Sequence, residues 1–426
     1  MYKALLLVVV VTLLVSCDIT TISDGDDNGL QEGEDTPSTG EPAPDPGSDG
    51  SEDSDDASTV PGPDSGSQEP DGALPIVYSG PIEITAGGVY SGAFESLERS
   101  VPAIRIKTSD PVVIENTHIR SLGNHIHSDY GFDAHVTVRN VSAIGIAPYD
   151  EGEYTGRFIN LDTYRFVLVE HSYLENTSGI YLHLSTQGAT VRITENQVRN
   201  IDGRRSDGAG STEGFHLVQF VQIDKGRGLV DSQIAWNEVI NDPYHSRVED
   251  VINLWDTTGT PQSPIRVHNN YIEGAYPNHP SVEEEYSGGG IILGDGGGGY
   301  QHAFDNQVVA TTNYGIAIAG GEHNLIENNR VVACGVLEDG RPIPAQNTGI
   351  YIWNQYERPF GNNVGRGNEV AWARGASRND WWVPDAHSWS DNEAILEAPI
   401  PCSAHGDEYG RWLEKLADNE RTVGTR

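Results

Sequence analysis

One short sequence phrase recurs along this chain, and its spacing leaves few folds open. Two apolar residues alternate with other residues, a polar residue and an asparagine follow, and the phrase ends on another apolar residue. Clear copies are VVIENTHI (Val112 to Ile119), VRITENQV (Val191 to Val198), IRVHNNYI (Ile265 to Ile272) and NLIENNRV (Asn324 to Val331). Aligned on the last apolar residue, one column contains Asn196, Asn237, Asn270, Asn306, Asn329 and Asn368. Asparagines in register from copy to copy predict a ladder of stacked side chains.

A second phrase follows most copies of the first. It has the form glycine, apolar, any, apolar, and it appears as GIYLHL, GFHLVQF, GIILGD, GIAIAG and GIYIWN, with DVINLW as a variant. Two short alternating strands that recur every roughly 23 to 41 residues are typical of a solenoid, in which stacked coils bury a face that no coil buries alone. The pattern therefore predicts an all-β solenoid domain over residues 76–375, with a β-sandwich as the alternative.

Over about 300 residues the pattern resembles the right-handed parallel β-helix superfamily typified by pectin and pectate lyases and by polygalacturonase-like hydrolases. The phrases STEGFHL, VEDVINL and GGGIILG follow one another in the order of the polygalacturonase-like acidic motifs, although Gly289 stands where that family has a histidine. The resemblance implies a right-handed parallel β-helix that acts on a polysaccharide, either as a glycoside hydrolase or as a polysaccharide lyase.

The two ends differ from the repetitive part. Residues 1–17 contain one lysine, an apolar run and a lipobox-like ending at Cys17, which predicts a lipoprotein signal peptide with Cys17 as the lipidated residue. An ordinary cleaved signal is the alternative. Residues 18–75 are rich in Asp, Glu, Gly, Ser and Pro and contain no Lys or Arg, which predicts a disordered acidic linker. We expect an exported protein, lipid-anchored to the cell envelope at the outer membrane or cell surface.

The C-terminal residues 376–426 are expected to form a tail that packs on the β-helix. Within it, one helical face would carry Tyr409, Trp412, Leu413 and Leu416, so a short capping helix is predicted. The chain has 3 cysteines, and with Cys17 lipidated, Cys334 and Cys402 are the expected disulfide pair of an exported protein.

The formal net charge of -37 argues against nucleic acid as a partner. We expect a monomer whose partners are a polysaccharide and, through the anchor, a membrane. An acidic protein that binds an anionic substrate needs a local arginine cluster or a bridging divalent cation, so Ca²⁺ is the candidate cofactor.

Side chains alternate between the two faces of a strand, so the apolar positions of the second phrase also define which residues point outward. This alignment places Glu213 and Asp250 on neighbouring coils in one outward column, with His216 and Asn253 beside them. Like charges one coil apart share a proton, bind a cation or meet an arginine. The candidate catalytic residues are Glu213, Asp250, Glu249, His216, Lys225 and Arg247, and the candidate metal ligands are Glu213, Asp250, Asn253, Asp256 and Asp295.

Aromatic and polar side chains of the same face are suited to sugar rings and their hydroxyl groups. The expected substrate-binding residues are Tyr181, His183, Trp255, Trp353, Tyr351 and Asn354. Three functions remain open: a hydrolase with paired carboxyl groups, a lyase with a base and a cation, and a non-catalytic, lipid-anchored glycan-binding or surface-structure protein.

Overall fold

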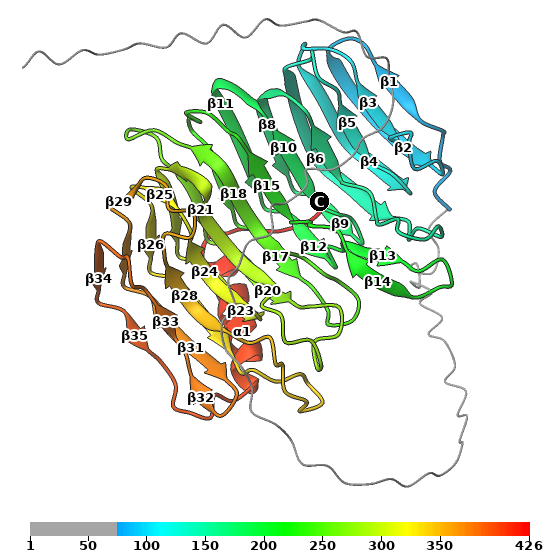
Figure 1. Ribbon diagram of the computed structural model, residues 1–426. Coiled ribbons are helices and arrows are strands. Elements are labelled where there is room, and N and C mark those ends of the chain that lie inside the picture. The colour runs from blue at the N-terminus through cyan, green and yellow to red at the C-terminus, as the bar shows by residue number, and fades with distance from the viewer. Residues whose placement is uncertain (1–74) are drawn as a thin grey trace, which may run out of the picture. The chain divides into compact units, whose positions relative to one another are not determined.

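The computed structural model describes residues 75–426, which belong to one compact unit. This part of the chain is all-β apart from one α-helix, and most of its strands lie in two large sheets with parallel pairing (Figure 1). The colours in Figure 1 run along the sheets in chain order, because successive strands of each sheet come from successive turns of the chain. We call each such turn a coil. The arrangement is compatible with a parallel β-helix.

The first sheet has 13 strands, and each coil contributes one strand to its main path. In order across the sheet, the main path consists of β1 (Ile82–Ile84), β3 (Ile104–Ile106), β5 (Ile126–Ser128), β7 (Ile159–Leu161), β10 (Ile180–His183), β15 (Val221–Asp224), β18 (Asp250–Thr258), β21 (Gly289–Gly299), β24 (Tyr314–Ile318), β28 (Thr348–Ile352) and β33 (Trp381–Trp382), with β25 (Gly321–Glu322) and β29 (Phe360–Gly361) at its side.

The second sheet has 20 strands, because most coils contribute two. Its strands are β2 (Gly88–Ser96), β4 (Val112–Ser121), β6 (Ala134–Gly145), β8 (Tyr164–Glu170), β9 (Tyr173–Glu175), β11 (Ser185–Thr194), β12 (Gln197–Arg199), β16 (Gln233–Ala235), β17 (Glu238–Ile240), β19 (Ile265–His268), β20 (Tyr271–Ala275), β22 (Gln301–Phe304), β23 (Gln307–Thr311), β26 (Leu325–Glu327), β27 (Arg330–Ala333), β30 (Val364–Arg366), β31 (Glu369–Arg374), β32 (Ser377–Arg378), β34 (Ser388–Ser390) and β35 (Glu393–Ala394). A separate hairpin consists of β13 (Arg204–Ser206) and β14 (Thr212–Phe215).

The core lies between the two sheets and is built from aliphatic residues stacked in register. In the 13-stranded sheet one inward column is fully buried and contains Ile104, Ile126, Ile159, Ile180, Val221, Ile252, Ile291, Ile316 and Ile350. The spacing between its members ranges from 21 residues, between Ile159 and Ile180, to 41 residues, between Ile180 and Val221. Such uneven spacing keeps the strands in register while the loops vary in length, and those loops build the surroundings of the outer face.

The predicted asparagine ladder is confirmed. Asn196 Nδ2 donates to Asn237 Oδ1 at 2.9 Å, and Asn237 Nδ2 donates to Asn270 Oδ1 at the same distance. The series continues through Asn306, Asn329 and Asn368 and ends on Asn392. In the inner rungs each Oδ1 also accepts the backbone N–H of the preceding asparagine, and each Nδ2 also donates to a backbone carbonyl. These buried amides are therefore fully hydrogen-bonded, as a buried polar group must be.

The tail contains the only α-helix of residues 75–426, α1 (Ser403–Asp418). Trp412 and Leu416 are buried against Trp236 and Tyr271, whereas Leu413 is 47% exposed, so the expected apolar face is wrong at that residue. The helix contacts β23 and β27, which are inner strands of the 20-stranded sheet. It therefore covers the side of the sheet, and the prediction of an end cap is wrong.

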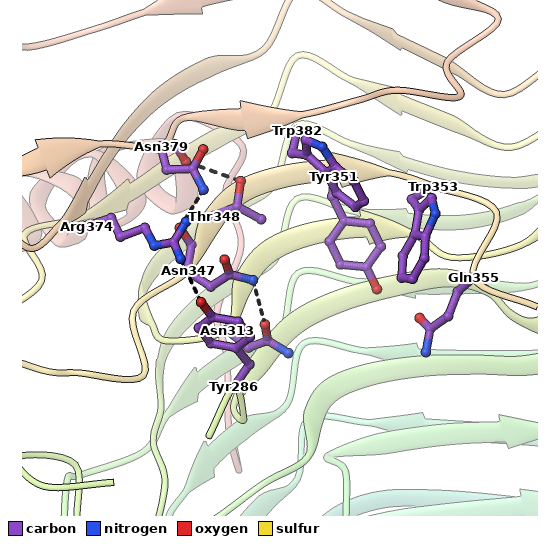
Figure 2. A pocket seen from close by; sticks show the side chains of 10 residues that line it. All are labelled: Tyr286, Asn313, Asn347, Thr348, Tyr351, Trp353, Gln355, Arg374, Asn379 and Trp382. Atoms are coloured by element: carbon purple, nitrogen blue, oxygen red, sulfur yellow. Dashed lines mark hydrogen bonds between the residues drawn. The ribbon is translucent and has the colours of Figure 1, made fainter. Parts of the chain in front are cut away.

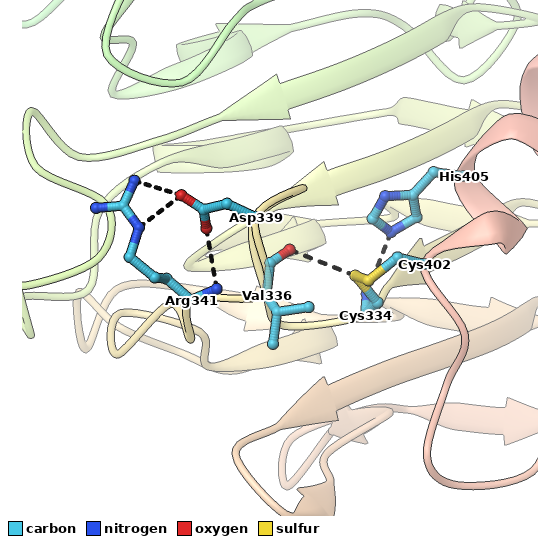
Figure 3. The surroundings of a disulfide bond; sticks show 6 residues. All are labelled: Cys334, Val336, Asp339, Arg341, Cys402 and His405. Carbon is cyan, nitrogen blue, oxygen red and sulfur yellow. Dashed lines mark hydrogen bonds and ion pairs between the residues drawn. A yellow bond between two sulfur atoms is a disulfide. The ribbon is translucent and has the colours of Figure 1, made fainter.

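The disulfide joins Cys334 and Cys402, the pair expected from the sequence, and it fixes the start of α1 beside β27 (Figure 3). His405 accepts the backbone N–H of Cys334 through Nε2 at 3.2 Å, and burial lowers its pKa to about 4. Strands that pair into the sheets continue past residue 375, as far as β35. The expected domain boundary at 375/376 therefore falls within the sheets.

Within residues 75–426 no helix combines the length and apolar character that a membrane crossing requires. The expected signal peptide with Cys17 lies outside the described residues, as does the expected linker of residues 18–75 apart from Pro75.

Candidate functional site

The outer face of the 13-stranded sheet carries a column of polar and aromatic side chains. Strand register aligns His127, Asn160, Tyr181, Gln222, Asn253, Ile292, Ala317, Tyr351 and Trp382 in this column. Between Asn160 and Tyr351, six of these positions agree with the alternation of the second sequence phrase, namely Asn160, Tyr181, Asn253, Ile292, Ala317 and Tyr351. The exception is Gln222, which occupies the position predicted for His216.

The predicted pairing of Glu213 with Asp250 is wrong. Ile252 pairs with Val221, and continuing that register two residues back places Gln219 beside Asp250. Glu213 is exposed in β14, where it belongs to the antiparallel hairpin with β13. Phe215 and Leu217 hold the apolar positions of the phrase GFHLVQF, which should point inward, yet Leu217 is 41% exposed and Val221 and Ile223 fill the core. The hairpin is an insertion before the true strand, which begins six residues later than expected.

His216 and Arg247, two further catalytic candidates, make packing and ion-pair contacts around this hairpin. The His216 ring stacks on Tyr154 with ring centroids 4.0 Å apart, and burial, together with nearby arginines, lowers its pKa to about 4. Arg247 is 4% exposed, and its guanidinium forms an ion pair with Glu283 at 3.1 Å and lies over the Phe215 ring. The structure therefore does not bring either side chain to Asp250.

Three of the five predicted metal ligands do meet, on β18 and β21. Asn253 Nδ2 donates to Asp250 Oδ2 at 3.0 Å and to Asp295 Oδ2 at 2.7 Å. The hydroxyl groups of Tyr314 and Tyr356 donate to the remaining oxygen of Asp250 and of Asp295, respectively. We call the carboxyl groups of Asp250 and Asp295, together with the three side chains that donate to them, the acid pair. Its two carboxyl groups share a single amide donor.

Burial determines the protonation of the acid pair. Asp250 is 4% and Asp295 5% exposed. Burial, followed by the charges of Glu249 and Asp295, raises the pKa of Asp250 well above its ordinary value, and burial also raises the pKa of Asp295. Gly289 is required beside them, because a Cβ there would collide with the Tyr314 ring and with Asp250.

The predicted calcium site is not assembled. Glu213 lies in the hairpin, and Asp256 is held in an ion pair with Arg227 at 2.6 Å. At the acid pair, the carboxylate oxygens already accept hydrogen bonds from an amide and two hydroxyl groups, whereas calcium requires six to eight oxygen ligands. These residues fit carboxyl groups that keep their protons better than they fit ligands of a divalent cation.

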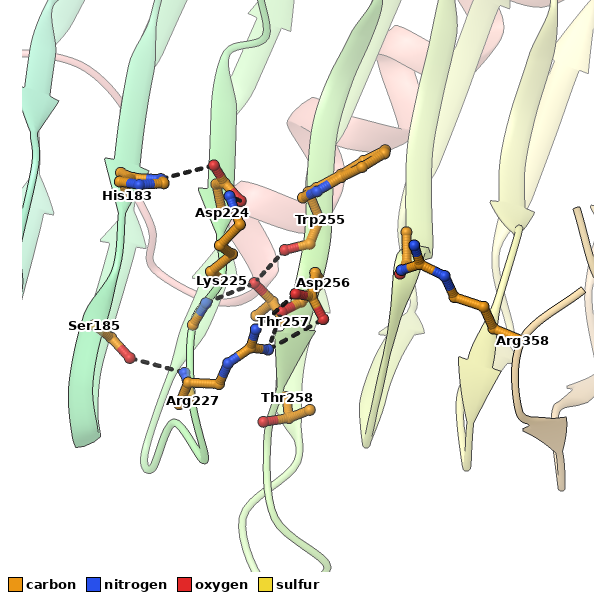
Figure 4. Close-up of polar contacts among 12 residues, drawn as sticks. His183, Ser185, Asp224, Lys225, Arg227, Trp255, Asp256, Thr257, Thr258 and Arg358 are labelled. Atoms are coloured by element: carbon orange, nitrogen blue, oxygen red, sulfur yellow. Dashed lines mark hydrogen bonds and ion pairs between the residues drawn. The ribbon is translucent and has the colours of Figure 1, made fainter. Parts of the chain in front are cut away.

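A second cluster lies on β10 and β15, and we call it the histidine cluster (Figure 4). His183 Nδ1 lies 2.7 Å from Asp224 Oδ2, and the Tyr181 hydroxyl donates to the same oxygen at 2.7 Å. The Lys225 ammonium group is 3.4 Å from the other oxygen, Oδ1, as an ion pair without hydrogen-bond geometry. The sheet brings these residues together because His183 and Asp224 are direct neighbours in the parallel register.

The contacts of the histidine cluster define its chemistry. When Nδ1–H of the neutral His183 ring donates a hydrogen bond to Asp224, the free lone pair of that ring is on Nε2, which can then act as a base. Burial and the hydrogen bond to Asp224 raise the pKa of Tyr181, so its hydroxyl keeps its proton at neutral pH. The guanidinium of Arg157 lies 5.2 Å from the centre of the Tyr181 ring. The cluster therefore contains a potential base in His183, a proton donor in Tyr181 and a cation in Lys225.

Next to the histidine cluster, ligand atoms of His127, Asp129 and Asp162 lie within 4.8 Å of one another. Asp129 already accepts two hydrogen bonds from Arg105, at 2.7 and 2.8 Å, and lies 2.9 Å from His127 Nε2. The charge of Asp129 is thus balanced by a fixed guanidinium, which leaves a weak donor set for a metal ion.

Near the C-terminal end of the same face, a cavity of about 460 Å³ opens over β28 and β33 (Figure 2). It is lined by Tyr286, Asn313, Asn347, Thr348, Tyr351, Trp353, Gln355, Arg374, Asn379 and Trp382. Tyr351 and Trp353 were expected substrate-binding residues. Asn354 is not among the lining residues, and its Nδ2 donates to Arg358 O at 3.2 Å. Trp255 packs edge-on against Tyr356 beside the acid pair.

Sequence reasoning missed three important residues. Asp224 was missed because the strand of this coil was placed six residues too early in the sequence. The alternation of VQID, which forms the actual strand, is itself a strand signal. Trp382 follows the expected end of the domain at residue 375, and Arg374 lies just before that end, where the second phrase no longer recurs. The pair Trp381-Trp382 was the available signal for one more coil.

No family model matches this chain, and no curated protein matches it.

Proposed function

We propose that this protein is a carbohydrate-active enzyme that cleaves an acidic polysaccharide by elimination on the outer face of the 13-stranded sheet. The observation that carries the proposal is the convergence of Tyr181 and His183 on one carboxylate oxygen of Asp224, with Lys225 beside them. Elimination next to a carboxyl group requires a base, a proton donor and a cation, and all three are present in the histidine cluster.

In the proposed reaction, His183 Nε2 removes the proton from the sugar carbon that bears the carboxyl group. The electron pair of that C–H bond forms a double bond to the neighbouring carbon. The bond from that neighbour to the glycosidic oxygen breaks, and the oxygen takes the proton of Tyr181. Lys225 stabilises the negative charge that develops on the carboxylate. Atoms and electrons balance without an oxidant or a reductant.

The test compares His183→Ala and Tyr181→Phe with the wild type on a panel of acidic polysaccharides. Each variant is expected to lose about 10²- to 10⁴-fold in turnover, the usual contribution of a general acid or base. The readout is the ultraviolet absorbance of the new double bond, measured together with reducing ends. His118→Ala is the control, because His118 is an exposed histidine of β4 in the other sheet. Full activity in both cluster variants would contradict the proposal.

Hydrolysis is the second candidate, and the acid pair is the observation that favours it. Two carboxyl groups that accept hydrogen bonds from one amide lie close together, and the raised pKa of Asp250 suits a general acid. Reducing ends without double-bond absorbance, abolished by Asp250→Asn, would support this candidate. Binding without either product would support a glycan-binding protein.

The finer structural expectations belong to the same proposal. We infer that the domain is a right-handed parallel β-helix of the pectate lyase-like kind and that a lipid on Cys17 anchors it to the cell envelope. The long parallel sheets and the asparagine ladder support the fold. A Cys17→Ser variant should shift the protein from the membrane fraction to the soluble fraction, which tests the anchor.

A further inference from the structure

The cavity over β28 and β33 has an aromatic side. Trp353 is 39% and Trp382 47% exposed, and their rings are 5.3 Å apart at an angle of 54°. Tyr351 lies beneath them and is almost fully buried. Figure 2 shows both indoles flanking the Tyr351 ring. Large exposed rings at a cavity rim are unusual on an acidic surface, and flat rings pack well on the apolar faces of sugars.

The opposite side of the cavity is polar and carries a positive charge. Asn347 Nδ2 donates to Asn313 Oδ1 at 3.2 Å, which fixes both amides at the rim. The Arg374 guanidinium donates to the Tyr286 hydroxyl at 2.6 Å. None of the lining residues is acidic, and no ion pair joins Arg374 to a carboxylate within residues 75–426. In a chain of net charge -37, this is a local site for an anion.

We propose that this cavity is a separate subsite that binds one carboxylate-bearing sugar unit of an acidic glycan. The indoles of Trp353 and Trp382 hold the ring, the rim amides bind hydroxyl groups, and Arg374 binds the carboxylate. The inference deepens the proposed function and rests on it for the polysaccharide. A neutral sugar would use the aromatic rings and the amides but would leave the guanidinium without a partner.

The position of the cavity fits a chain that also reaches the histidine cluster. From β15 to β28 there are four strand steps, which is about 19 Å at the usual strand spacing of about 4.8 Å. Both sites lie on the same face of the sheet, and the outer column that connects them contains Asn253 and Tyr351. An oligosaccharide laid across the strands would contact the cavity several units away from the bond that is cleaved.

The experiment measures binding of purified hexasaccharides by calorimetry and by tryptophan fluorescence. Galacturonate and mannuronate hexasaccharides are the acidic probes, and xylose and glucose hexasaccharides are the neutral probes. Trp353→Ala, Trp382→Ala and Arg374→Gln are each expected to weaken binding of an acidic probe roughly tenfold or more. Matched controls are Tyr149→Ala, an exposed aromatic residue elsewhere, and Arg366→Gln, an exposed arginine of β30 that is paired with Glu327.

The outcomes separate the subsite from the chemistry. Binding that Arg374→Gln weakens for acidic but not for neutral probes supports the subsite. Unchanged affinity in all three variants, equal affinity for neutral probes, or no binding of any acidic probe overturns it. Cleavage of long polysaccharides by these variants, measured separately, decides the proposed function, because they leave His183 and Tyr181 intact.

Discussion

The asparagine ladder and the acid pair both consist of buried polar side chains that connect neighbouring coils. They differ in how completely their donors and acceptors are hydrogen-bonded. In the ladder, Asn270 Oδ1 accepts two hydrogen bonds from Asn237 and its Nδ2 donates two. In the acid pair, Asn253 Nδ2 serves two carboxyl groups, while its Oδ1 is buried without a hydrogen-bond partner within residues 75–426. The same residue type is satisfied in one sheet and unsatisfied in the other.

The difference shows what each structure contributes. A neutral amide whose hydrogen bonds are all made leaves no unpaired group and does not titrate, so the ladder stabilises the stack at every pH. Two buried carboxyl groups that share one donor are costly when both are charged. Carboxyl groups with perturbed pKa values concentrate at functional sites, and the acid pair lies on the same outer face as the histidine cluster and the cavity.

The largest expected effect comes from breaking the ladder. Asn270→Ala removes the acceptor of two Asn237 donors and the partner of the Ile234 carbonyl, all of which are buried. We expect a loss of about 3 to 5 kcal/mol in the free energy of unfolding, since each orphaned group costs about 1 to 3 kcal/mol. Urea denaturation should give the same loss at acidic and neutral pH, because the amide does not titrate.

Asn392→Ala is the internal control for this experiment. Asn392 ends the ladder and is only half-buried: its Oδ1 accepts two hydrogen bonds from Asn368, as in the inner rungs, but its Nδ2 donates one, to Gly365, instead of two. We expect Asn392→Ala to lower the free energy of unfolding clearly less than Asn270→Ala does. Equal losses would mean that the contribution of a rung does not depend on how deeply its amide is buried.

The second effect sharpens the contrast, because Asn253→Ala should destabilise the protein more at higher pH. The Asn253 amide lowers the pKa of both Asp250 and Asp295 against the larger effect of burial. Without the amide, both carboxyl groups stay protonated in the native state to a higher pH, and the folded protein then binds more protons than the unfolded chain. Stability must therefore fall more steeply as pH rises.

We expect the destabilisation by Asn253→Ala to be about 1 to 3 kcal/mol larger at about pH 8 than at about pH 4. Asn160→Ala is the matched control, since Asn160 occupies the same outer column two coils from Gln222 and, among residues 75–426, forms no hydrogen bond with a carboxylate. Thermal denaturation across a pH series measures both. A flat profile for Asn253→Ala would show that its amide acts like a ladder rung.

Much of the fold could be predicted from the sequence, because repetition amplifies a weak signal. A single alternating strand is ambiguous, but the asparagine column from Asn196 to Asn368 fixed the register of one sheet over several coils. The inward column of the other sheet was predicted wherever a glycine marked the strand start, as at Ile180, Ile291 and Ile350. The end of the stack was missed, because β33 to β35 follow coils in which the glycine signal is lost.

The site was harder to predict, because function depends on which coil stands next to which. Shifting the strand after β14 by six residues preserves the alternation of inward and outward side chains, so GFHL and VQID fit the pattern equally well. Only the hydrogen-bonded register shows that Asp224 lies beside His183 and that Glu213 lies in a hairpin. Three-dimensional pairing across 41 residues, from Ile180 to Val221, carries no local sequence signal.

The smallest effect should come from Asp250→Asn, which makes the acid pair more like the ladder. In the wild type, the raised pKa of Asp250 means that the unfolded carboxyl group releases its proton first, near its ordinary value of 3.8. Stability is therefore lost as pH rises from that value through the folded pKa, at about 1.4 kcal/mol for each unit of difference. The neutral amide removes this loss but replaces an oxygen that accepts a hydrogen bond, from Tyr314 or from Asn253, with a donor. We expect a net gain on the order of 1 kcal/mol at neutral pH and none at about pH 4.

Asp256→Asn, at a surface ion pair with Arg227, is the control and should change stability by less than about 1 kcal/mol at either pH. A loss of stability at neutral pH in Asp250→Asn would mean that the charged carboxylate is stabilised by Tyr314 and Asn253 as completely as a ladder amide is by its neighbours.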